Sequence, residues 1–195
     1  MQPQILQRMD ACGLGSAPID AVLITHEHVD HVGSARILDD RLYKLRERRI
    51  PFFMTPGTAS SLNPKVCPQG VELVEAGEEF TLGTLDIDPF PIPHDTRDPV
   101  AFRVGRDGRW VGVVTDLGRP TALVQQRLSS MTVAVLEFNH DMEMLMSGNY
   151  PWHLKQRIRS NHGHLSNLQA ASLLEGAVGG ELRQVILAHL SEENN

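Results

Sequence analysis

Three histidines and an aspartate stand close together in the segment Thr25-His26-Glu27-His28-Val29-Asp30-His31. Neutral imidazole and carboxylate are the ligands that zinc and related divalent metals prefer. In an extended or turning loop, residues two apart project to one side, so His26 and His28 can bind one ion while Asp30 and His31 turn toward a second. A lone histidine is usually an ordinary polar residue, but this concentration of donors predicts a metal site.

Further donors follow three apolar segments elsewhere in the chain. His94 follows DPFPIP, Asp116 follows WVGVVT and His189 follows RQVILA. A compact metal site gathers residues from elements that are distant in sequence, and strand ends are a suitable place for them. Together with the four donors above, these residues suit two metals with Asp116 bridging and a water or hydroxide between them, an arrangement that generates a nucleophile and neutralises an oxyanion.

The elements that must position these donors follow from the spacing of apolar residues. A helix is expected at about 3–12, ending near Gly13, and a strand at 19–25 leads directly into the histidine segment. The other expected helices span 35–45, 122–128, 154–159 and 165–177, and the other expected strands span 51–55, 71–76, 85–92, 100–104, 109–115, 131–138 and 183–190. Asp107-Gly108 predicts a hairpin turn. This order predicts an α/β fold with sheets covered by helices.

The composition sets the class of protein. The 195 residues contain 41% hydrophobic and 22% charged residues, which is ordinary globular usage, and we expect one domain over 1–195. The net charge of −6 argues against binding to nucleic acid or lipid by total charge alone, although a local basic face is compatible with it. No apolar run is long enough for a membrane span and no signal peptide is recognisable, so we expect a cytoplasmic protein without a membrane partner. The oligomeric state stays open.

The HEHVDH motif and the later His94, Asp116 and His189 resemble the metallo-β-lactamase superfamily, whose ligand motifs occur in this order. The segments VVTDLG, LEFNHDMEML, NHGHLSN and LAHLSEENN are similar to the YycJ (WalJ) branch, which is related to ribonuclease Z and associated with phosphodiester cleavage and exonuclease activity. The resemblance runs from about residue 20 to residue 195. It implies an αββα sandwich fold.

The resemblance also implies a ligand for each metal position. The first metal would be bound by His26, His28 and His94, the second by Asp30, His31 and His189, and Asp116 would be shared. The implied cofactors are two divalent ions, zinc first, with manganese and iron as alternatives. Zinc β-lactamases place cysteine at the bridging position, so Asp116 favours the phosphodiesterase and thioesterase branches.

The chain departs from the family pattern at its ends. Family members usually open with a pair of strands before the first helix, whereas this sequence begins at that helix and ends six residues after His189. We therefore expect a metallo-β-lactamase-type domain that lacks the N-terminal strands and is truncated at that end, with truncation at the C-terminus as a further option.

Candidate catalytic groups beyond the metal ligands come from the same resemblance. His164, in the NHGHLSN segment, matches a histidine that precedes the last ligand in ribonuclease Z, and Glu137 matches its glutamate partner. An imidazole with a pKa near 6.5 can protonate a departing oxygen. We name Asp30, His164 and Glu137 as catalytic candidates. A helix-capping or ligand-supporting role is the alternative for His164, and a supporting role is expected for His140 and His162.

A basic helix face precedes the NHGH segment. Lys155 and Arg159 lie four residues apart and would share that face, so they are candidates for binding phosphates, with a solvated surface as the alternative. Neutral donors to phosphate oxygens are expected from Asn161, Ser166 and Asn167. Tyr150 and Trp152 are able to stack on bases, although a turn packed on the core explains them more simply.

The function expected from these residues is metal-dependent hydrolysis of phosphodiester bonds in DNA or RNA, by an exonuclease-like enzyme using a metal-activated water. A small-molecule hydrolase, such as a thioesterase or cyclic phosphodiesterase, is the alternative, because the same seven ligands serve it. A non-catalytic nucleic-acid-binding protein is a third interpretation, against which the complete ligand set argues.

Overall fold

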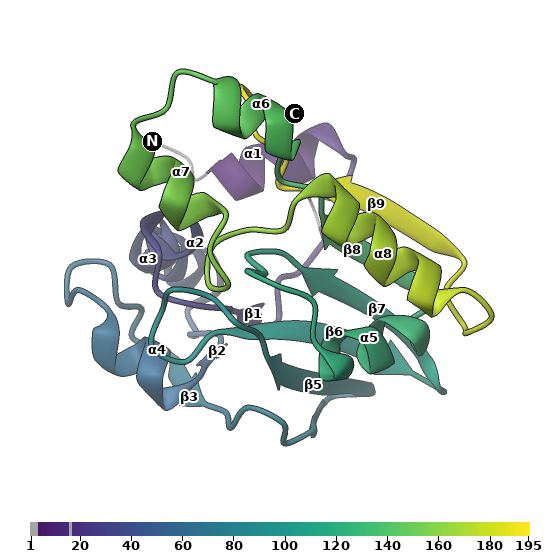
Figure 1. Cartoon of the computed structure of the whole chain (residues 1–195). Helices are drawn as coiled ribbons and strands as arrows, with labels where there is room; N and C mark the ends of the chain where they lie inside the picture. Colours follow the sequence, from purple (N-terminus) through teal and green to yellow (C-terminus); the bar gives the residue numbers. More distant parts are fainter. Residues whose placement is uncertain (1–3, 16) are drawn as a thin grey trace. The chain divides into compact units, whose positions relative to one another are not determined.

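The computed structural model describes residues 4–15 and 17–195, and the chain divides into two compact units (Figure 1). Unit 1 runs up to Glu75 and includes Thr96–Asp98, and unit 2 comprises Ala76–Asp95 and Pro99–Asn195. Each unit has its own sheet and its own hydrophobic core. Within the described ranges, no helix is long and apolar enough to cross a bilayer.

Unit 1 is built on a three-stranded parallel sheet. Its elements are α1 (Gln4–Ala11), β1 (Val22–Leu23), α2 (Val29–Val32), α3 (Ala35–Arg46), β2 (Phe52–Met54), α4 (Pro56–Ser61) and β3 (Val71–Leu73). The strands lie in the order β1-β2-β3, with Val22 opposite Phe52 and Phe52 opposite Val71. Parallel neighbours need crossover connections, which α2 and α3 provide between β1 and β2, and α4 between β2 and β3.

The core of unit 1 includes one face of α3. Leu38 and Leu42, four residues apart in α3, are buried in one cluster with Phe52 of β2. Val32, at the end of α2, joins the same cluster. The core therefore anchors both sides of the segment 26–31, which leaves β1 and continues into α2.

Unit 2 is built on a six-stranded mixed sheet. Its elements are β4 (Phe80–Leu82), β5 (Leu85–Pro91), β6 (Val100–Arg106), β7 (Arg109–Val114), α5 (Ala122–Ser129), β8 (Val133–Glu137), α6 (Met142–Ser147), α7 (Trp152–Ile158), α8 (Asn167–Ala177) and β9 (Gln184–Ala188). The strands lie in sequence order, antiparallel from β4 to β7 and parallel from β7 to β9. The parallel strands are connected through α5 and through α6 to α8.

The core of unit 2 joins this sheet to two helices. Ala134 and Leu136, two apart on β8, face the same side and are buried with Val124 and Leu128 of α5 and with Leu173 of α8. Figure 1 shows α5 and α8 beside the sheet, and the two helices also contact each other.

The strand directions gather the candidate site residues of unit 2. Since β6 is antiparallel to both β5 and β7, and β7 to β9 are parallel, β5, β7, β8 and β9 all run the same way. Their carboxyl ends lie at one edge of the sheet. His94, Asp116 and His189 follow β5, β7 and β9, and Glu137 is the last residue of β8.

Most predicted elements are confirmed. The helices expected at 35–45, 122–128, 154–159 and 165–177 form as α3, α5, α7 and α8, and every expected strand forms, although several are shorter than predicted. Asp107 and Gly108 have positive φ values of 52° and 76°, as a two-residue hairpin turn requires. The first helix ends at Ala11, and its predicted start at residue 3 lies outside the described residues.

Four short elements among the described residues were not predicted, namely α2, which forms where a turning loop was expected, and α4, α6 and β4. In α4, PGTASS offers no large apolar side chain, and the helix is defined by Thr55, whose Oγ1 accepts a hydrogen bond from Thr58 N at 3.3 Å, and by proline at its first position. In α6, Asp141 caps the helix by accepting from Met144 N at 2.9 Å. β4 is only three residues long. Local capping and short length, rather than periodicity, therefore account for these differences.

Candidate metal centre

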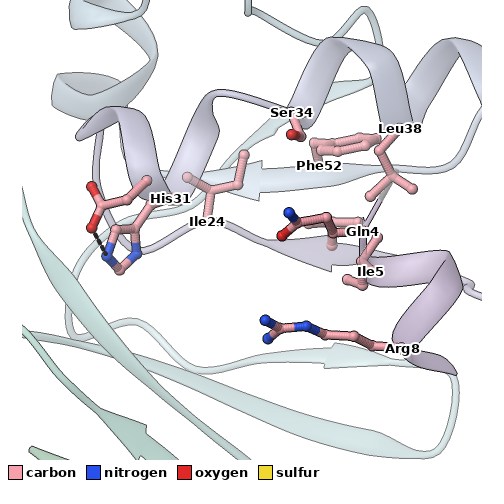
Figure 2. Close-up of a pocket in the computed structure, with 11 residues that line it drawn as sticks. Gln4, Ile5, Arg8, Ile24, His31, Ser34, Leu38 and Phe52 are labelled. Atoms are coloured by element: carbon pink, nitrogen blue, oxygen red, sulfur yellow. Dashed lines mark ion pairs between the residues drawn. The ribbon is translucent and has the colours of Figure 1, made fainter. Parts of the chain in front are cut away.

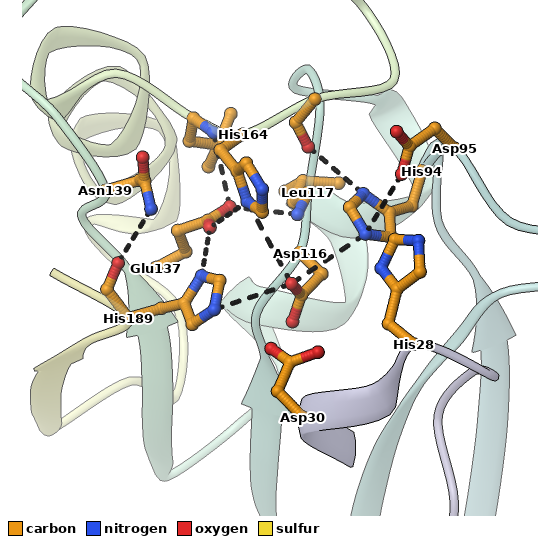
Figure 3. Close-up of polar contacts among 12 residues, drawn as sticks. His28, Asp30, His94, Asp95, Asp116, Leu117, Glu137, Asn139, His164 and His189 are labelled. Atoms are coloured by element: carbon orange, nitrogen blue, oxygen red, sulfur yellow. Dashed lines mark hydrogen bonds and ion pairs between the residues drawn. The ribbon is translucent and has the colours of Figure 1, made fainter. Parts of the chain in front are cut away.

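A buried carboxylate organises the strand ends of unit 2. Oε1 of Glu137 lies 2.8 Å from Nδ1 of His164 and 2.7 Å from Nδ1 of His189, and Oε2 accepts hydrogen bonds from the backbone N–H groups of Leu117 and Leu165 at 2.9 and 3.2 Å (Figure 3). Four contacts thus hold a side chain that has no exposed surface. Glu137 is a positioning residue that fixes two imidazoles at once.

The charge on Glu137 follows from these contacts. Burial opposes ionisation, but the hydrogen bonds from His164 and His189 outweigh it, so the pKa of Glu137 lies below the usual value for glutamate. An ionised carboxylate accepts hydrogen bonds from both Nδ1–H groups, which leaves each Nε2 as the nitrogen that faces a ligand or substrate. This is the orientation that a metal ligand at His189 and a proton donor at His164 both need.

Asp116 lies beside these imidazoles. Its Oδ1 is 3.5 Å from Nε2 of His189 and 3.8 Å from Nε2 of His94, and its side chain is almost fully buried. Nδ1 of His94 contacts the backbone carbonyl of Gly163 at 3.1 Å, so Nε2 of His94 is again the nitrogen that faces Asp116. Figure 3 shows the rings of His94 and His189 converging on this carboxylate from two sides.

The backbone is strained at two of the predicted ligands. Asp116 has a φ of 62° and His189 a φ of 55°, in the left-handed region that side-chain-bearing residues rarely adopt. Such a conformation costs about 1–3 kcal/mol and persists where the surroundings impose it, most often at functional sites. Both residues turn the chain directly after a strand, which directs their side chains toward the carboxyl edge of the sheet.

The donor set of unit 2 is suited to a metal. Ligand atoms of Asp116, Glu137, His164 and His189 lie within 4.8 Å of one another. Nitrogen and oxygen donors of this kind accept zinc, manganese or iron. Because Glu137 is occupied by two histidines and two backbone groups, Asp116 and His189 are the members of this group that fit direct coordination.

The histidine segment forms the corresponding cluster in unit 1. Oγ1 of Thr25 lies 3.0 Å from Nδ1 of His26 and 3.1 Å from Nδ1 of His31, and the two rings are 4.0 Å apart between centroids. Nε2 of His26 is 3.2 Å from Nδ1 of His28. Asp30 Oδ2 lies 3.7 Å from Nε2 of His31. The segment therefore brings its imidazoles together and uses the threonine hydroxyl to orient two of them.

The spacing within the segment has a structural reason. Glu27 is directed away from its neighbouring histidines, and its Oε1 accepts a hydrogen bond from the backbone N–H of Arg97 at 2.9 Å. His28 is the residue before α2, so Asp30 and His31 lie within the single turn of this four-residue helix. Successive side chains of the extended segment point to opposite sides, so His26 and His28 share one side and Glu27 lies on the other. The helical backbone of α2 then turns the side chains of Asp30 and His31 in a different direction.

Unit 1 also contains a cavity next to this segment. It has a volume of about 350 Å³ and lies between α1, α3 and the sheet, with Ile24, Leu38 and Phe52 among its apolar lining (Figure 2). His31 and Arg8 contribute polar groups to the same lining. The cavity thus extends from an apolar interior to the histidine segment.

The predicted substrate-binding residues have varied surroundings. Lys155 is buried, and its Nζ donates to the carbonyl groups of Met146 and Gly148 at 2.8 and 2.6 Å, so its ammonium group binds the end of α6 instead of being available to a phosphate. Arg159 is exposed, with its guanidinium 5.7 Å from the ring centre of Trp152. Of this pair, only Arg159 lies on an accessible surface.

The three neutral donors also differ. Ser166 is the N-cap of α8 and forms a capping box with Gln169, which uses its hydroxyl within the protein. Nδ2 of Asn167 donates to Oδ1 of Asn195 at 3.2 Å. Asn161 is the first residue of the NHGH segment and lies in an exposed turn. The hydroxyl group of Ser166 is therefore used in helix capping. Of the three residues, Asn161 is the one that lies in an exposed loop.

The structure adds residues that sequence reasoning did not single out. Asp95 follows His94, lies 3.6 Å from its Nε2 and accepts a hydrogen bond at 2.5 Å from Nε of Arg157. Thr25 orients two histidines, as described above. Both residues are immediate sequence neighbours of predicted ligands, which is the signal that would have identified them.

Comparisons with known proteins identify the family of this chain. The model of the beta-lactamase superfamily domain matches residues 2–190. The chain is 33% identical over 182 residues to exodeoxyribonuclease WalJ of Streptococcus pneumoniae and 29% identical over 180 residues to exodeoxyribonuclease YycJ of Bacillus anthracis, each match covering 91% of this chain. It covers 65% and 66% of those two proteins.

A solved structure supports the fold. Zn²⁺-bound PqqB from Methylobacterium extorquens matches with a TM-score of 0.68 at 16% identity, over 99% of this chain and 72% of that protein. The α/β metallo-β-lactamase fold predicted from sequence is confirmed, and so is the resemblance to the WalJ and YycJ exodeoxyribonucleases. With its histidine and aspartate donors at the strand ends, this chain belongs to the metallo-β-lactamase superfamily.

Proposed function

We propose that the chain is a dinuclear metal-dependent phosphodiesterase that acts on nucleic acid, with exonuclease-like cleavage of DNA as its main reaction. The observation that carries the proposal is the double contact of Glu137, whose Oε1 holds both His164 and His189. One carboxylate thereby orients a predicted metal ligand and a predicted proton donor. The names of the two bacterial relatives favour DNA over RNA.

The proposed ligands are the seven residues predicted from sequence. His26, His28 and His94 would bind the first ion and Asp30, His31 and His189 the second, with Asp116 shared. Nδ1 of His94 and of His189 each contacts a protein acceptor, as expected for imidazoles that bind metal through Nε2. We propose zinc as the metal, with manganese and iron as alternatives that the same donors accept.

The chemistry divides between the ions and the chain. When bound, two divalent ions lower the pKa of a water molecule and neutralise charge on the phosphate. Hydrolysis would form a bond from a water oxygen to phosphorus and break the bond from phosphorus to the leaving oxygen, which would keep the electron pair. Nε2 of His164 would supply the proton to that oxygen, while Glu137 holds the ring by Nδ1.

Substrate phosphates need accessible donors. Arg159 and Asn161 lie on exposed segments at the end of α7 and just after it, close in sequence to His164. We propose that these two residues contact phosphates flanking the scissile bond. Lys155 and Ser166 are not part of this proposal, because their polar groups are bound within the protein.

A substrate panel tests the proposed function. The purified chain is loaded with zinc or manganese and assayed on labelled single- and double-stranded DNA, RNA, bis(p-nitrophenyl) phosphate and a thioester. We expect hydrolysis of DNA and of the small phosphodiester, and no activity after metal chelation. Hydrolysis of the thioester alone would identify a small-molecule hydrolase, and binding of DNA without hydrolysis of any substrate would identify a non-catalytic protein.

A further inference from the structure

A second cavity lies within unit 2, beside the proposed proton donor. It has a volume of about 360 Å³, in the range of small-ligand sites, and is formed by α7, the turn before it and the segments that follow β8 and β9. Its lining includes Asn139, Tyr150, Leu154, Arg157, His164 and Glu192. The metal chemistry proposed above does not use this cavity.

We propose that this cavity binds the nucleobase of the nucleotide that carries the leaving oxygen. The inference rests on the proposed function and extends it by naming the part of the substrate that the enzyme recognises beyond the phosphate. His164 is the link, because it lines the cavity and also contacts Glu137. The oxygen that receives its proton is bonded to a sugar, so the base of that nucleotide is one sugar away from the His164 ring.

The walls of the cavity suit a flat aromatic ligand. Tyr150 offers an aromatic ring, and Leu154 and Ile158, four residues apart on α7, offer aliphatic surface. Every base has a π face, so stacking on an aromatic side chain is a recognition that tolerates any sequence. An enzyme that removes successive nucleotides from a chain end needs this tolerance.

The polar groups of the cavity favour a base over a phosphate. Glu192 places a carboxylate in the lining, which repels an anion and accepts a hydrogen bond from a base amino group. Arg157 is the cation of the lining, and its Nε already donates to Asp95 at 2.5 Å. The Asp95 carboxylate offsets this charge, so the cavity combines apolar walls with acceptor groups.

The test compares substrates with and without each base. KM and kcat are measured on the zinc-loaded chain for the dinucleotide d(CpC) and for two derivatives in which one or the other cytosine is replaced by hydrogen. We expect removal of the leaving-side base to raise KM on the order of tenfold, since stacking is worth about 1–3 kcal/mol per base. Removal of the other base should change KM little.

Variants assign this effect to Tyr150. Tyr150→Ala should raise the KM for d(CpC) by the same factor and leave the KM for the leaving-side abasic substrate unchanged, and Tyr150→Phe should restore the wild-type value. Tyr150→Leu, which keeps an apolar side chain without a ring face, is the second variant in case the alanine variant loses its fold by circular dichroism. Tyr43→Ala is the matched control, because Tyr43 is an exposed tyrosine of α3 outside the cavity lining.

Calorimetry separates this proposal from the proposed function. Titration with deoxycytidine monophosphate and with deoxyribose 5-phosphate should show tighter binding of the nucleotide, and Tyr150→Ala should abolish the difference. Equal KM values for d(CpC) and both abasic substrates, or a Tyr150→Ala variant that keeps full discrimination, would overturn the base site while leaving a working phosphodiesterase. If the wild-type chain hydrolysed none of the phosphodiesters, that result would instead contradict the proposed function.

Discussion

Oε1 of Glu137 accepts a hydrogen bond from Nδ1 of His189 at 2.7 Å, and the histidine occupies a left-handed backbone conformation with a φ of 55°. The carboxylate and the strained turn act on the same ring. One fixes which nitrogen faces outward, and the other directs the side chain as the chain leaves β9. The contact explains why a glutamate that need not bind metal itself lies fully buried at the end of β8.

Replacement of this carboxylate should weaken metal binding. Glu137→Gln keeps the shape of the side chain but removes the negative charge of the group that accepts hydrogen bonds from both Nδ1–H groups, so we expect metal affinity to fall by about 10–100-fold. Competition with a fluorescent chelator measures the affinity. Glu143→Gln, at an exposed acidic position of α6, is the control and should bind metal like the wild type. An unchanged metal affinity in Glu137→Gln would show that the charge of Glu137 does not support the metal ligands.

Loss of the proton donor should depend on the leaving group. His164→Ala should lower the rate on DNA on the order of a hundredfold or more, because general acid catalysis is typically worth about 10²–10⁴. A nitrophenyl phosphodiester has a leaving group that needs little protonation, so its rate should fall much less. Metal content, measured in parallel, should stay the same. Equal losses on both substrates would show that His164 supports the site without donating a proton.

The stability of the metal-free chain should depend on His140. This side chain is fully buried, and burial lowers the pKa of His140 below its usual value; His164 lowers it further, while Glu137 and Asp141 oppose the shift. Since the unfolded chain takes up a proton near pH 6.5 more readily than the folded chain, the free energy of unfolding should fall as pH drops below about 6.5. Urea unfolding between pH 7.5 and pH 5.5 measures this slope.

Two variants isolate the His140 contribution. His140→Asn cannot titrate, so its unfolding free energy should fall less over the same pH range. His153→Asn replaces an exposed histidine in α7 and should keep the wild-type slope. A His140→Asn variant with the full wild-type slope would assign the pH dependence to other groups.

Lys155 and Arg159 should separate into a structural and a binding role. Lys155→Gln removes the charged ammonium group that donates hydrogen bonds to two backbone carbonyls, so we expect the unfolding free energy to fall by about 1–3 kcal/mol. Arg159→Gln, on the exposed surface, should change stability by less than about 0.5 kcal/mol and raise the KM for DNA. Thermal unfolding and steady-state kinetics on both variants provide the comparison. A Lys155→Gln variant with wild-type stability and a raised KM for DNA would show that Lys155 binds substrate.

The metal ligands can be predicted from the sequence because their pattern is local. HEHVDH is contiguous, and His94, Asp116 and His189 each follow an apolar run that the strand pattern identifies. Parallel strand direction then brings the strand ends of unit 2 to one edge, which makes the Glu137 cluster foreseeable once the strands are assigned. The interaction of one carboxylate with two histidines matches the expected pairing of Glu137 with His164 and adds His189 to it.

Other residues depend on contacts that periodicity does not reveal. The helical spacing of Lys155 and Arg159 is correct, but which acceptors surround each cation depends on where α6 ends. A serine hydroxyl can bind a phosphate or cap a helix, and the sequence alone does not distinguish the two roles. In the structure, Ser166 forms a capping box at the start of α8. Sequence patterns therefore identify the strand ends and their donors, whereas the use of each polar group is settled by neighbours distant in the chain.

The metal content of an Asp116→Asn variant tests whether Asp116 is shared by two ions. Metal analysis of the purified wild-type chain should give two tightly bound divalent ions, and the variant, which keeps the size of the side chain and loses its charge, should bind fewer ions and lose phosphodiester hydrolysis while keeping its circular dichroism spectrum. A variant that retains two tightly bound ions and full activity would contradict a shared aspartate at the centre of the site.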